Sequence, residues 1–123
     1  MNILEKRAVV LFAHGSRDPL WHKPMEAVAA QFASDAPDIA VRCAYLELSS
    51  PDLATVCQEL VLTGVNCISV LPLFLGVGRH AREDLPLLVE HLRSAYPQVL
   101  FALKPAVGED PRLILLLAQI AAE

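Results

Sequence analysis

The sequence predicts an α/β fold: an open, three-layer αβα sandwich around one parallel sheet of four strands. Three observations lead to this prediction. Apolar runs alternate with segments of helical periodicity, which is typical of a parallel sheet with crossover helices. The runs are apolar almost throughout, as expected of strands that are covered on both faces. The links are short, and four strands are too few to close a barrel.

The first apolar run extends from Ala8 to Ala13 and ends at a polar turn. Pro24 suits the first position of a helix. The apolar residues of this helix recur on one face, and they are Met25, Val28 and Phe32. A second apolar run follows from Ile39 to Leu46. These residues therefore predict the first strand, the first helix and the second strand.

The segment "SSPD" predicts the start of the second helix. We expect Ser50 to cap this helix and Pro51 to take its first position. Asp52 favours the positive end of the helix dipole. Gly64 ends the helix, because glycine readily adopts the left-handed conformation found after helix ends. The expected buried stripe consists of Leu53, Val56, Cys57, Leu60 and Val61.

The second half of the chain repeats the pattern. The third run extends from Cys67 to Leu75, and a loop, "GVGRHARED", follows over residues 76–84. The fourth run is Val99 to Leu103, and Asp110 with Pro111 opens the last helix. Right-handed crossovers favour a flavodoxin-like strand order, 2-1-3-4. The third helix is marked by Leu85, Leu88, Val89 and Leu92.

Length and composition limit the class of protein. The 123 residues fit a single domain, 1–123, and 54% of them are apolar. A net charge of -4 argues against a nucleic-acid or membrane-surface partner. No run reaches the length of a membrane span, and the start "MNILEKR" lacks the apolar stretch of a signal peptide. Three cysteines without a CxxC pair are expected to be small buried thiols. We therefore expect a soluble cytoplasmic protein.

Three polar residues follow the first three strands at one edge of the predicted sheet. His14 ends the first strand, Glu47 ends the second, and His80 lies in the loop after the third. In such sheets ligands bind beyond the carboxyl ends of the strands, where the strand order reverses. Two imidazoles and a carboxylate form a plausible open shell for a divalent transition metal. Each residue also has an ordinary alternative as a solvated loop or helix-entry side chain.

Other polar residues near this edge have weaker claims. His22 is a second-rank candidate, and His91 is expected to be exposed in mid-helix. Gly76 and Gly78 allow positive φ or close approach of a ligand. Ser16 lacks a base–acid pair in hydrolase order, so it is assigned to substrate binding rather than to nucleophilic attack. The cations that could hold an anionic substrate, or remain ordinary solvated charges, are Arg17, Lys23, Arg79, Arg82 and Lys104.

The segments "AHGSRDP", "YLELSSPDL" and "VLPLFLGVGRHAREDLP" resemble the short sirohydrochlorin chelatases of the CbiX type. These are class II tetrapyrrole chelatases, related in fold to the ferrochelatases. The resemblance implies ATP-independent insertion of Co²⁺, with Fe²⁺ or Ni²⁺ as alternatives, into sirohydrochlorin in cobalamin- or sirohaem-type biosynthesis. It implies that His14 and His80 handle the metal, which is a substrate and not a permanent cofactor. Glu47 matches the family's acidic residue more loosely.

The chemistry of these residues agrees with metal insertion. Two pyrrole N–H protons must leave the macrocycle as the metal enters, and a neutral imidazole can bind the metal or accept a proton. A carboxylate can relay the second proton, and arginines would pair with the carboxylates of the substrate. A carrier that binds without catalysing is the alternative function. A phosphohistidine-type phosphatase needs an arginine where Ala13 stands, and a receiver domain needs acidic residues where His14 stands.

The closing segment, "PRLILLLAQIAAE", predicts an assembly. It is apolar nearly all round, whereas a helix that covers a sheet needs only one apolar stripe. Large apolar patches usually mark a partner surface. The rim of one small domain is also shallow for a broad, flat tetrapyrrole. We therefore expect a symmetric homodimer in which both rims face one cavity. The sequence leaves open which surface forms the contact, and a deeply buried last helix is the alternative.

Overall fold

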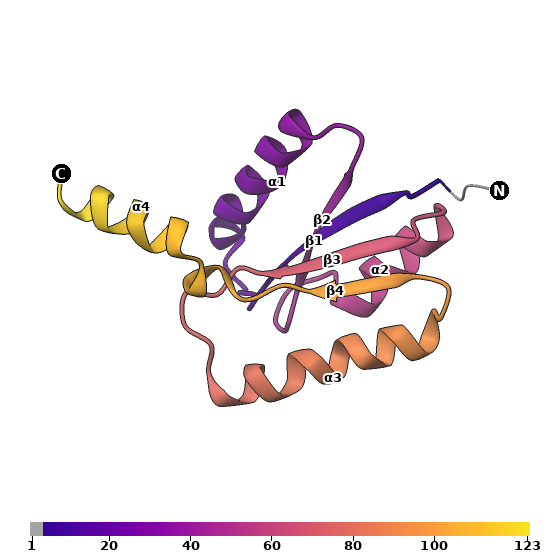
Figure 1. Ribbon diagram of the computed structural model, residues 1–123. Coiled ribbons are helices and arrows are strands. Elements are labelled where there is room, and N and C mark those ends of the chain that lie inside the picture. The colour runs from indigo at the N-terminus through magenta and orange to yellow at the C-terminus, as the bar shows by residue number, and fades with distance from the viewer. Residues whose placement is uncertain (1–3) are drawn as a thin grey trace.

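The structure is a computed structural model that describes residues 4–123, so the first three residues of the expected domain lie outside the described part. The strands are all parallel and lie in the order β2-β1-β3-β4, which confirms the predicted topology. Figure 1 shows the sheet between α1 on one side and α2 and α3 on the other. The elements are β1 (Arg7–Ala13), η1 (Pro19–His22), α1 (Lys23–Asp35), β2 (Ala40–Tyr45), α2 (Leu53–Leu62), β3 (Cys67–Pro72), α3 (Arg79–Ala95), β4 (Leu100–Leu103), η2 (Val107–Glu109) and α4 (Pro111–Ala121).

The main core lies between the sheet and the helices α2 and α3. Alternate residues of β1 point into it, and Val10 and Phe12 are almost fully buried there. The apolar stripes of both helices cover these strands, because residues three and four apart share one helix face. Val61 and Leu88 are only partly buried, whereas the rest of the two predicted stripes is buried. The buried stripe residues are Leu53, Val56, Cys57, Leu60, Ala81, Leu85, Val89 and Leu92.

The opposite face of the sheet is covered only in part. Helix α1 packs on β1 and β2, with Met25 buried against them. Val28 of the same predicted stripe is 46% exposed. On β4 this face is bare, since Leu100 is 70% exposed and Ala102 is also exposed. The expectation that every strand is covered on both faces is therefore wrong for β4, because α4 does not lie on the sheet.

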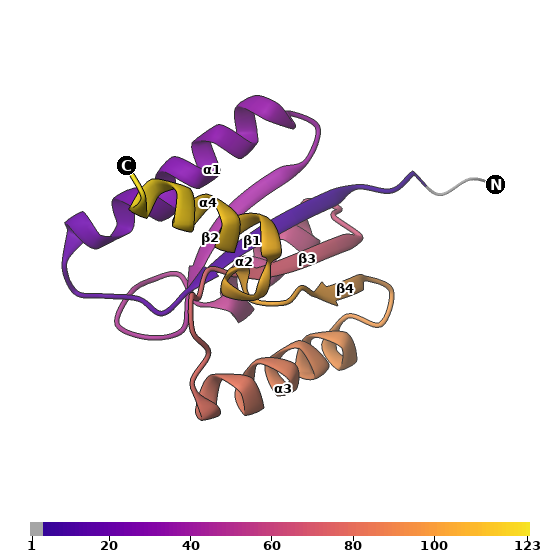
Figure 2. The same ribbon diagram turned by 60° about the vertical axis from the view of Figure 1, so that its left-hand side comes forward.

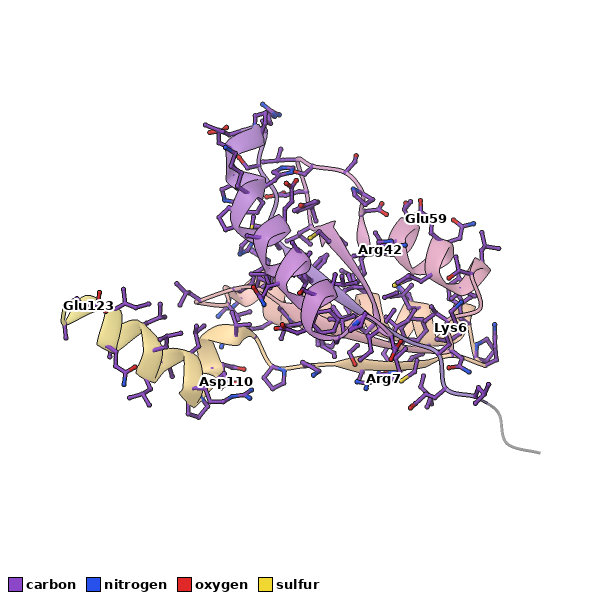
Figure 3. The ribbon with its side chains drawn as sticks, turned by 90° about the horizontal axis from the view of Figure 1, so that it is seen from above. Lys6, Arg7, Arg42, Glu59, Asp110 and Glu123 are labelled. Carbon is purple, nitrogen blue, oxygen red and sulfur yellow. The ribbon has the colours of Figure 1, made fainter. Side chains whose placement is uncertain are left out.

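Helix α4 stands away from the rest of the molecule. Figures 1 and 2 show it leaving the carboxyl end of the sheet, and Figure 3 shows Asp110 at its base and Glu123 at its tip. None of its residues is buried. Its main packing partner among the described elements is the short turn η2. The expected uncovered face is confirmed, and it is larger than expected because the helix leaves its own sheet.

The structure corrects two helix starts. Helix α2 begins at Leu53, and Asp52 is its N-cap because the carboxylate accepts the backbone N–H of Thr55 at 2.8 Å. The expected cap at Ser50 and the expected first helical position of Pro51 are therefore wrong. Helix α3 begins at Arg79, so the predicted loop after β3 ends earlier, at Gly78. Residues 79–84 add a helical turn because Ala81 extends the buried stripe towards the N-terminus.

Two further local predictions hold. Gly64 follows α2 with φ +92°, as the helix end requires. Asp110 caps α4, and its carboxylate accepts the backbone N–H of Arg112 at 2.9 Å. Among residues 4–123, no helix is both long enough and apolar enough to cross a membrane.

The three cysteines carry free thiols, but only one of them is fully buried. Burial raises the pKa of the Cys57 thiol to about 12. Cys43 and Cys67 are half-buried, so the expectation of three buried thiols holds fully for Cys57 alone. Burial, followed by the nearby charge of Glu26, raises the pKa of Cys43.

Candidate active site

His14 and Glu47 lie next to each other along the backbone at the carboxyl edge of the sheet. His14 directly follows β1, and Glu47 follows β2 after one intervening residue. The ladder between the two strands continues into their loops, because Leu46 N–H donates to Ala13 O at 2.9 Å and Glu47 N–H donates to His14 O at 3.0 Å. These two predicted site residues are thus held side by side by main-chain hydrogen bonds.

The His14 imidazole lies on an aromatic base supplied by the loop after β3. Its ring stacks on Phe74, with centroids 4.1 Å apart and planes at 24°. Phe74 is 1% exposed and contacts Phe12 of the core at a ring distance of 6.1 Å. Within residues 4–123 the ring nitrogens of His14 make no hydrogen bond, and the residue is exposed. The imidazole therefore has a defined plane and two open nitrogen positions.

His80 differs from the prediction, because it is the second residue of α3 and not a loop residue. It is exposed, as are its neighbours Arg79 and Arg82. Within residues 4–123, no three His, Cys, Asp or Glu side chains are close enough together to hold a metal ion. The single chain therefore does not pre-form a three-ligand shell from His14, Glu47 and His80, and their metal-handling roles stay predictions.

The glycines of the site region are not the ones that the sequence singled out. Gly76 and Gly78 have no positive φ, and a Cβ on either would meet nothing within 4 Å, so the first of the two expected reasons for glycine is wrong. The close approach of a ligand to these two residues stays a prediction. Gly15 has φ +103°, and a Cβ there would lie 1.7 Å from the carbonyl oxygen of Glu47. Only glycine allows the "HGSR" turn to lie this close to the β2–α2 loop. Its position directly after His14 was the available signal.

Gly108 is the second crowded glycine. A Cβ there would lie 1.7 Å from the carbonyl oxygen of Leu75. Its own N–H donates to Phe74 O at 3.0 Å. Gly108 thus holds the residues just after β3, including the aromatic base of His14, close to the turn η2. The sequence offered no motif that pointed to this role.

Ser16 and His22 form part of a hydrogen-bonded group with Ser49, a residue that the sequence analysis did not select. The Ser16 hydroxyl accepts the backbone N–H of Asp18 at 3.1 Å. The His22 Nε2 atom lies 3.0 Å from Ser49 Oγ and 3.3 Å from Ser16 O. His22 is thereby engaged within the protein, whereas His91 is exposed on α3 as expected.

The five cations that the sequence placed near the site are all exposed. Arg82 and Lys104 come together, because both line a small pocket of about 130 Å³ between α3 and the ends of β3 and β4. The two ion pairs found within residues 4–123, Arg93–Glu90 and Arg112–Asp110, involve none of the five. Their charges are therefore available to an anionic ligand. The five are Arg17, Lys23, Arg79, Arg82 and Lys104.

A larger groove of about 970 Å³ runs between α1, β3 and α4. We call it the α1–α4 groove. Its lining is mainly apolar and includes Met25, Val28, Leu71, Leu113 and Leu116. None of the three predicted metal-handling residues lines it. The groove is the gap left by α4 standing away from its own sheet.

Comparison with known proteins places this arrangement in a family. Residues 8–123 match CbiX. The chain belongs to the CbiX family. The match extends from β1 through α4, so it includes both loops that carry the "HGSR" turn and Glu47 as well as the start of α3.

Individual relatives agree with the CbiX assignment. The crystal structure of a CbiX protein from Marinobacter aquaeolei VT8 has a TM-score of 0.81 and 34% identity, covering 94% of each chain. The sirohydrochlorin cobaltochelatase of Methanococcoides burtonii is 30% identical over 82 residues, which cover 67% of this chain and 63% of that protein. The sirohydrochlorin ferrochelatase of Bacillus subtilis is 30% identical over 112 residues, 89% of this chain and 42% of that protein. The matched region is thus less than two thirds of these curated relatives.

Proposed function

We propose that this CbiX chain inserts a divalent metal, Co²⁺ in first place and Fe²⁺ or Ni²⁺ as alternatives, into sirohydrochlorin without ATP. The observation that carries the proposal is the His14 imidazole, stacked on buried Phe74 with both nitrogens open, beside the backbone of Glu47. The cobalto- and ferrochelatase activities of relatives support it. The reaction would belong to cobalamin- or sirohaem-type tetrapyrrole biosynthesis, with the metal as substrate and no permanent cofactor.

In the proposed mechanism, neutral imidazoles of His14 and His80 deliver the metal. An imidazole ligates through an unprotonated ring nitrogen, and both residues are exposed to an incoming ion. As the metal bonds to the macrocycle nitrogens, two pyrrole N–H protons leave. Glu47 accepts one as a carboxylate and an imidazole accepts the other, and both protons then pass to water. The charge of the divalent ion replaces that of the two protons, so no oxidant or reductant is needed.

The substrate's carboxylates would be held by the basic residues at the same edge. Arg17 follows the His14 turn and Arg79 precedes His80, so one guanidinium lies near each proposed metal-handling histidine in sequence. Ser16, Gly76 and Gly78 belong to the same proposed substrate-binding set. Arg17→Gln or Arg79→Gln should raise KM for sirohydrochlorin, and the increase should shrink at high salt. An unchanged KM in both variants would contradict this role.

The test of the function is an absorbance assay of sirohydrochlorin with each metal ion. His14→Ala and His80→Ala should lower chelation to the spontaneous rate measured with metal alone, while His91→Ala, an exposed histidine of α3, should keep wild-type activity. All three variants should melt like the wild type because the replaced side chains are exposed. Wild-type turnover in His14→Ala would contradict the mechanism. A wild-type protein that binds cobalt and sirohydrochlorin without accelerating the reaction would be the alternative carrier.

The proposal includes a symmetric homodimer in which a second copy fills the α1–α4 groove. Each chain presents both an apolar helix without a buried residue and a bare, largely apolar surface on β3 and β4. The groove is bounded by α4 itself, so the α4 helices of two copies could pair across a two-fold axis. The ferrochelatase relative is more than twice the length of the matched segment, as expected if one long chain replaces two short ones.

Mixing experiments test whether the two sites work together. Inactive His14→Ala chains mixed with wild-type chains should give less activity than the wild-type fraction predicts, if both rims face one cavity. Activity that simply follows the wild-type fraction would contradict a shared cavity. We also propose a cytoplasmic location, which the three free thiols support, because disulfides are rare there.

A further inference from the structure

A three-residue hydrogen-bonded group ties the β1–α1 loop to the β2–α2 loop. Ser49 Oγ lies at its centre: it accepts the backbone N–H of Ser16 at 2.9 Å and donates to Ser16 O at 2.7 Å. His22 Nε2 is 3.0 Å from the same hydroxyl and 3.3 Å from Ser16 O. One serine side chain thus satisfies both backbone groups of Ser16, and the histidine completes the group. We call this set the Ser–His clamp.

The atoms of the clamp determine where its protons lie. A hydroxyl has one proton, and Ser49 uses it towards Ser16 O, which can only accept. The remaining contacts of His22 Nε2 are a hydroxyl oxygen and a carbonyl oxygen, so this nitrogen must carry a hydrogen and donate it. Nε2 is therefore not available as a metal ligand. His22 acts inside the protein and not as a second version of His14.

Aromatic packing holds the His22 ring in the orientation that the clamp needs. The ring stacks on Tyr45, with centroids 4.8 Å apart and planes at 29°. Trp21 packs against it edge-on at 5.7 Å and 77°. Tyr45 is 4% exposed, and burial raises the pKa of its phenol, so the surface under His22 stays neutral. The ring has little freedom to turn away from Ser49.

The clamp lies across the most constrained backbone of the site. Leu48 has φ +63°, a left-handed conformation that is unfavourable for a residue with a Cβ, and it stands between Glu47 and Ser49. Gly15, with φ +103°, stands between His14 and Ser16 and lies against the Glu47 carbonyl. The clamp thus fixes the residue that follows each constrained position. Without it, both loops could relax.

We propose that His22 and Ser49 are positioning residues that set the spacing between His14 and Glu47. The inference rests on the proposed function of those two residues. Glu47 N–H already donates to His14 O at the strand side of the turn. The clamp closes the other side, so that the two loops are joined before and after their constrained residues. Displacement of a reacting group by about 1 Å can cost on the order of a hundredfold in rate.

The test compares His22→Leu and Ser49→Ala with His22→Gln, whose terminal amide can donate from nearly the same distance as Nε2. Matched controls are His91→Leu and Ser94→Ala on the exposed surface of α3. We expect kcat for metal insertion to fall between about tenfold and a hundredfold in His22→Leu and Ser49→Ala. KM for sirohydrochlorin should rise by a smaller factor than kcat falls, because Arg79, Arg82 and Lys104 lie outside the two loops that the clamp joins. His22→Gln should recover most of the lost kcat.

Two results would overturn the inference when the wild type is active. The first is unchanged kcat in both His22→Leu and Ser49→Ala. The second is a His22→Gln variant as slow as His22→Leu, which would show that His22 acts through ring packing alone. If the wild type itself does not insert metal, the proposed function fails. Hydrogen exchange of the Ser16 amide then tests the clamp by itself: protection should drop in Ser49→Ala and His22→Leu, and unchanged protection would refute it.

Discussion

The helices cover the two faces of the sheet to different extents. On the face covered by α2 and α3, Val10, Phe12, Ile68 and Val70 are no more than 1% exposed. On the face covered by α1, the sheet is covered over β1, partly covered over β2 and open over β4, where Leu100 is 70% exposed. Both faces belong to the same strands, so the difference arises from the helices and not from the sheet.

The difference shows how the distribution of apolar residues around a helix decides whether one sheet face can cover it. Helix α3 has one apolar stripe, and burial of that stripe against β3 and β4 satisfies it. Helix α4 is apolar on more than one side, so no single sheet face could cover it. A helix of this kind remains incomplete within one chain, and a second copy is the proposed complement. The fully covered face therefore supplies the core, and the partly covered face is the one on which the proposed second copy would pack.

The largest expected effect compares two leucines of α2. Leu60 is 1% exposed in the main core, and Leu62, two residues later, is 80% exposed. Leu60→Ala should lower the free energy of unfolding by about 2–5 kcal/mol, because it leaves a cavity. Leu62→Ala should change it by less than about 0.5 kcal/mol. Chemical denaturation measures both, and similar losses would show that the core does not lie where the structure places it.

The second effect concerns the partly covered face of the sheet and its α1–α4 groove. Leu116→Glu introduces a charge into the α1–α4 groove, so it should weaken the proposed dimer on the order of a hundredfold or more, since two copies each lose an apolar contact. Leu87→Glu, on an exposed leucine of α3, is the matched control and should leave association unchanged. Light scattering across a dilution series measures the change. A wild-type monomer at micromolar concentration would defeat the dimer proposal.

A smaller effect separates the caps of α2 and α4. Asp52→Ala should lower the free energy of unfolding by about 1 kcal/mol, because α2 packs in the main core. Asp110→Ala should change it by less than about 0.5 kcal/mol, because α4 adds little to that core. Both are best measured in the Leu116→Glu background, where assembly does not contribute. Equal losses would mean that α4 packs on its own chain.

The smallest expected effect is the titration of Asp110. Hydrogen bonds from the Arg112 side chain and then from its backbone N–H lower the pKa of this carboxyl to about 2. An ordinary aspartate has a pKa of about 3.9. The carboxylate's support of the start of α4 is therefore complete above about pH 4 and is lost as the pH falls through about 2. The Arg112 amide shift should follow this midpoint, and Arg112→Gln should raise it. A midpoint near 4 in the wild type would contradict the cap.

Helical and strand periodicity in the sequence is sufficient to predict the fold of this chain. Short apolar runs between helical segments lead to parallel strands, and right-handed crossovers leave few strand orders, of which 2-1-3-4 is the observed one. The same connectivity brings His14 and Glu47 to one edge, because every strand points the same way. These features depend on local spacing, which a single sequence displays directly.

Tertiary structure decided what lies around those residues. The Phe74 base under His14, the crowding of Gly15 and the Ser–His clamp all join residues far apart in the chain. No local period encodes such contacts, so Ser49 gave no signal, and His22 was only a second-rank candidate for the site. The start of α3, which places His80 on a helix, likewise depended on the burial of Ala81.

The orientation of α4 shows the same division. Its sequence predicted that one chain would leave an apolar face uncovered, with a deeply buried helix as the alternative, because apolar side chains surround the helix axis. Whether it would lie on its own sheet or leave it depended on how the turn η2 packs against the residues after β3. Gly108 allows that turn to approach the Leu75 carbonyl, and α4 continues from the turn away from the sheet. The hydrophobicity of α4 is a property of its own sequence, whereas its direction relative to the sheet is set by contacts between segments that are distant in the chain.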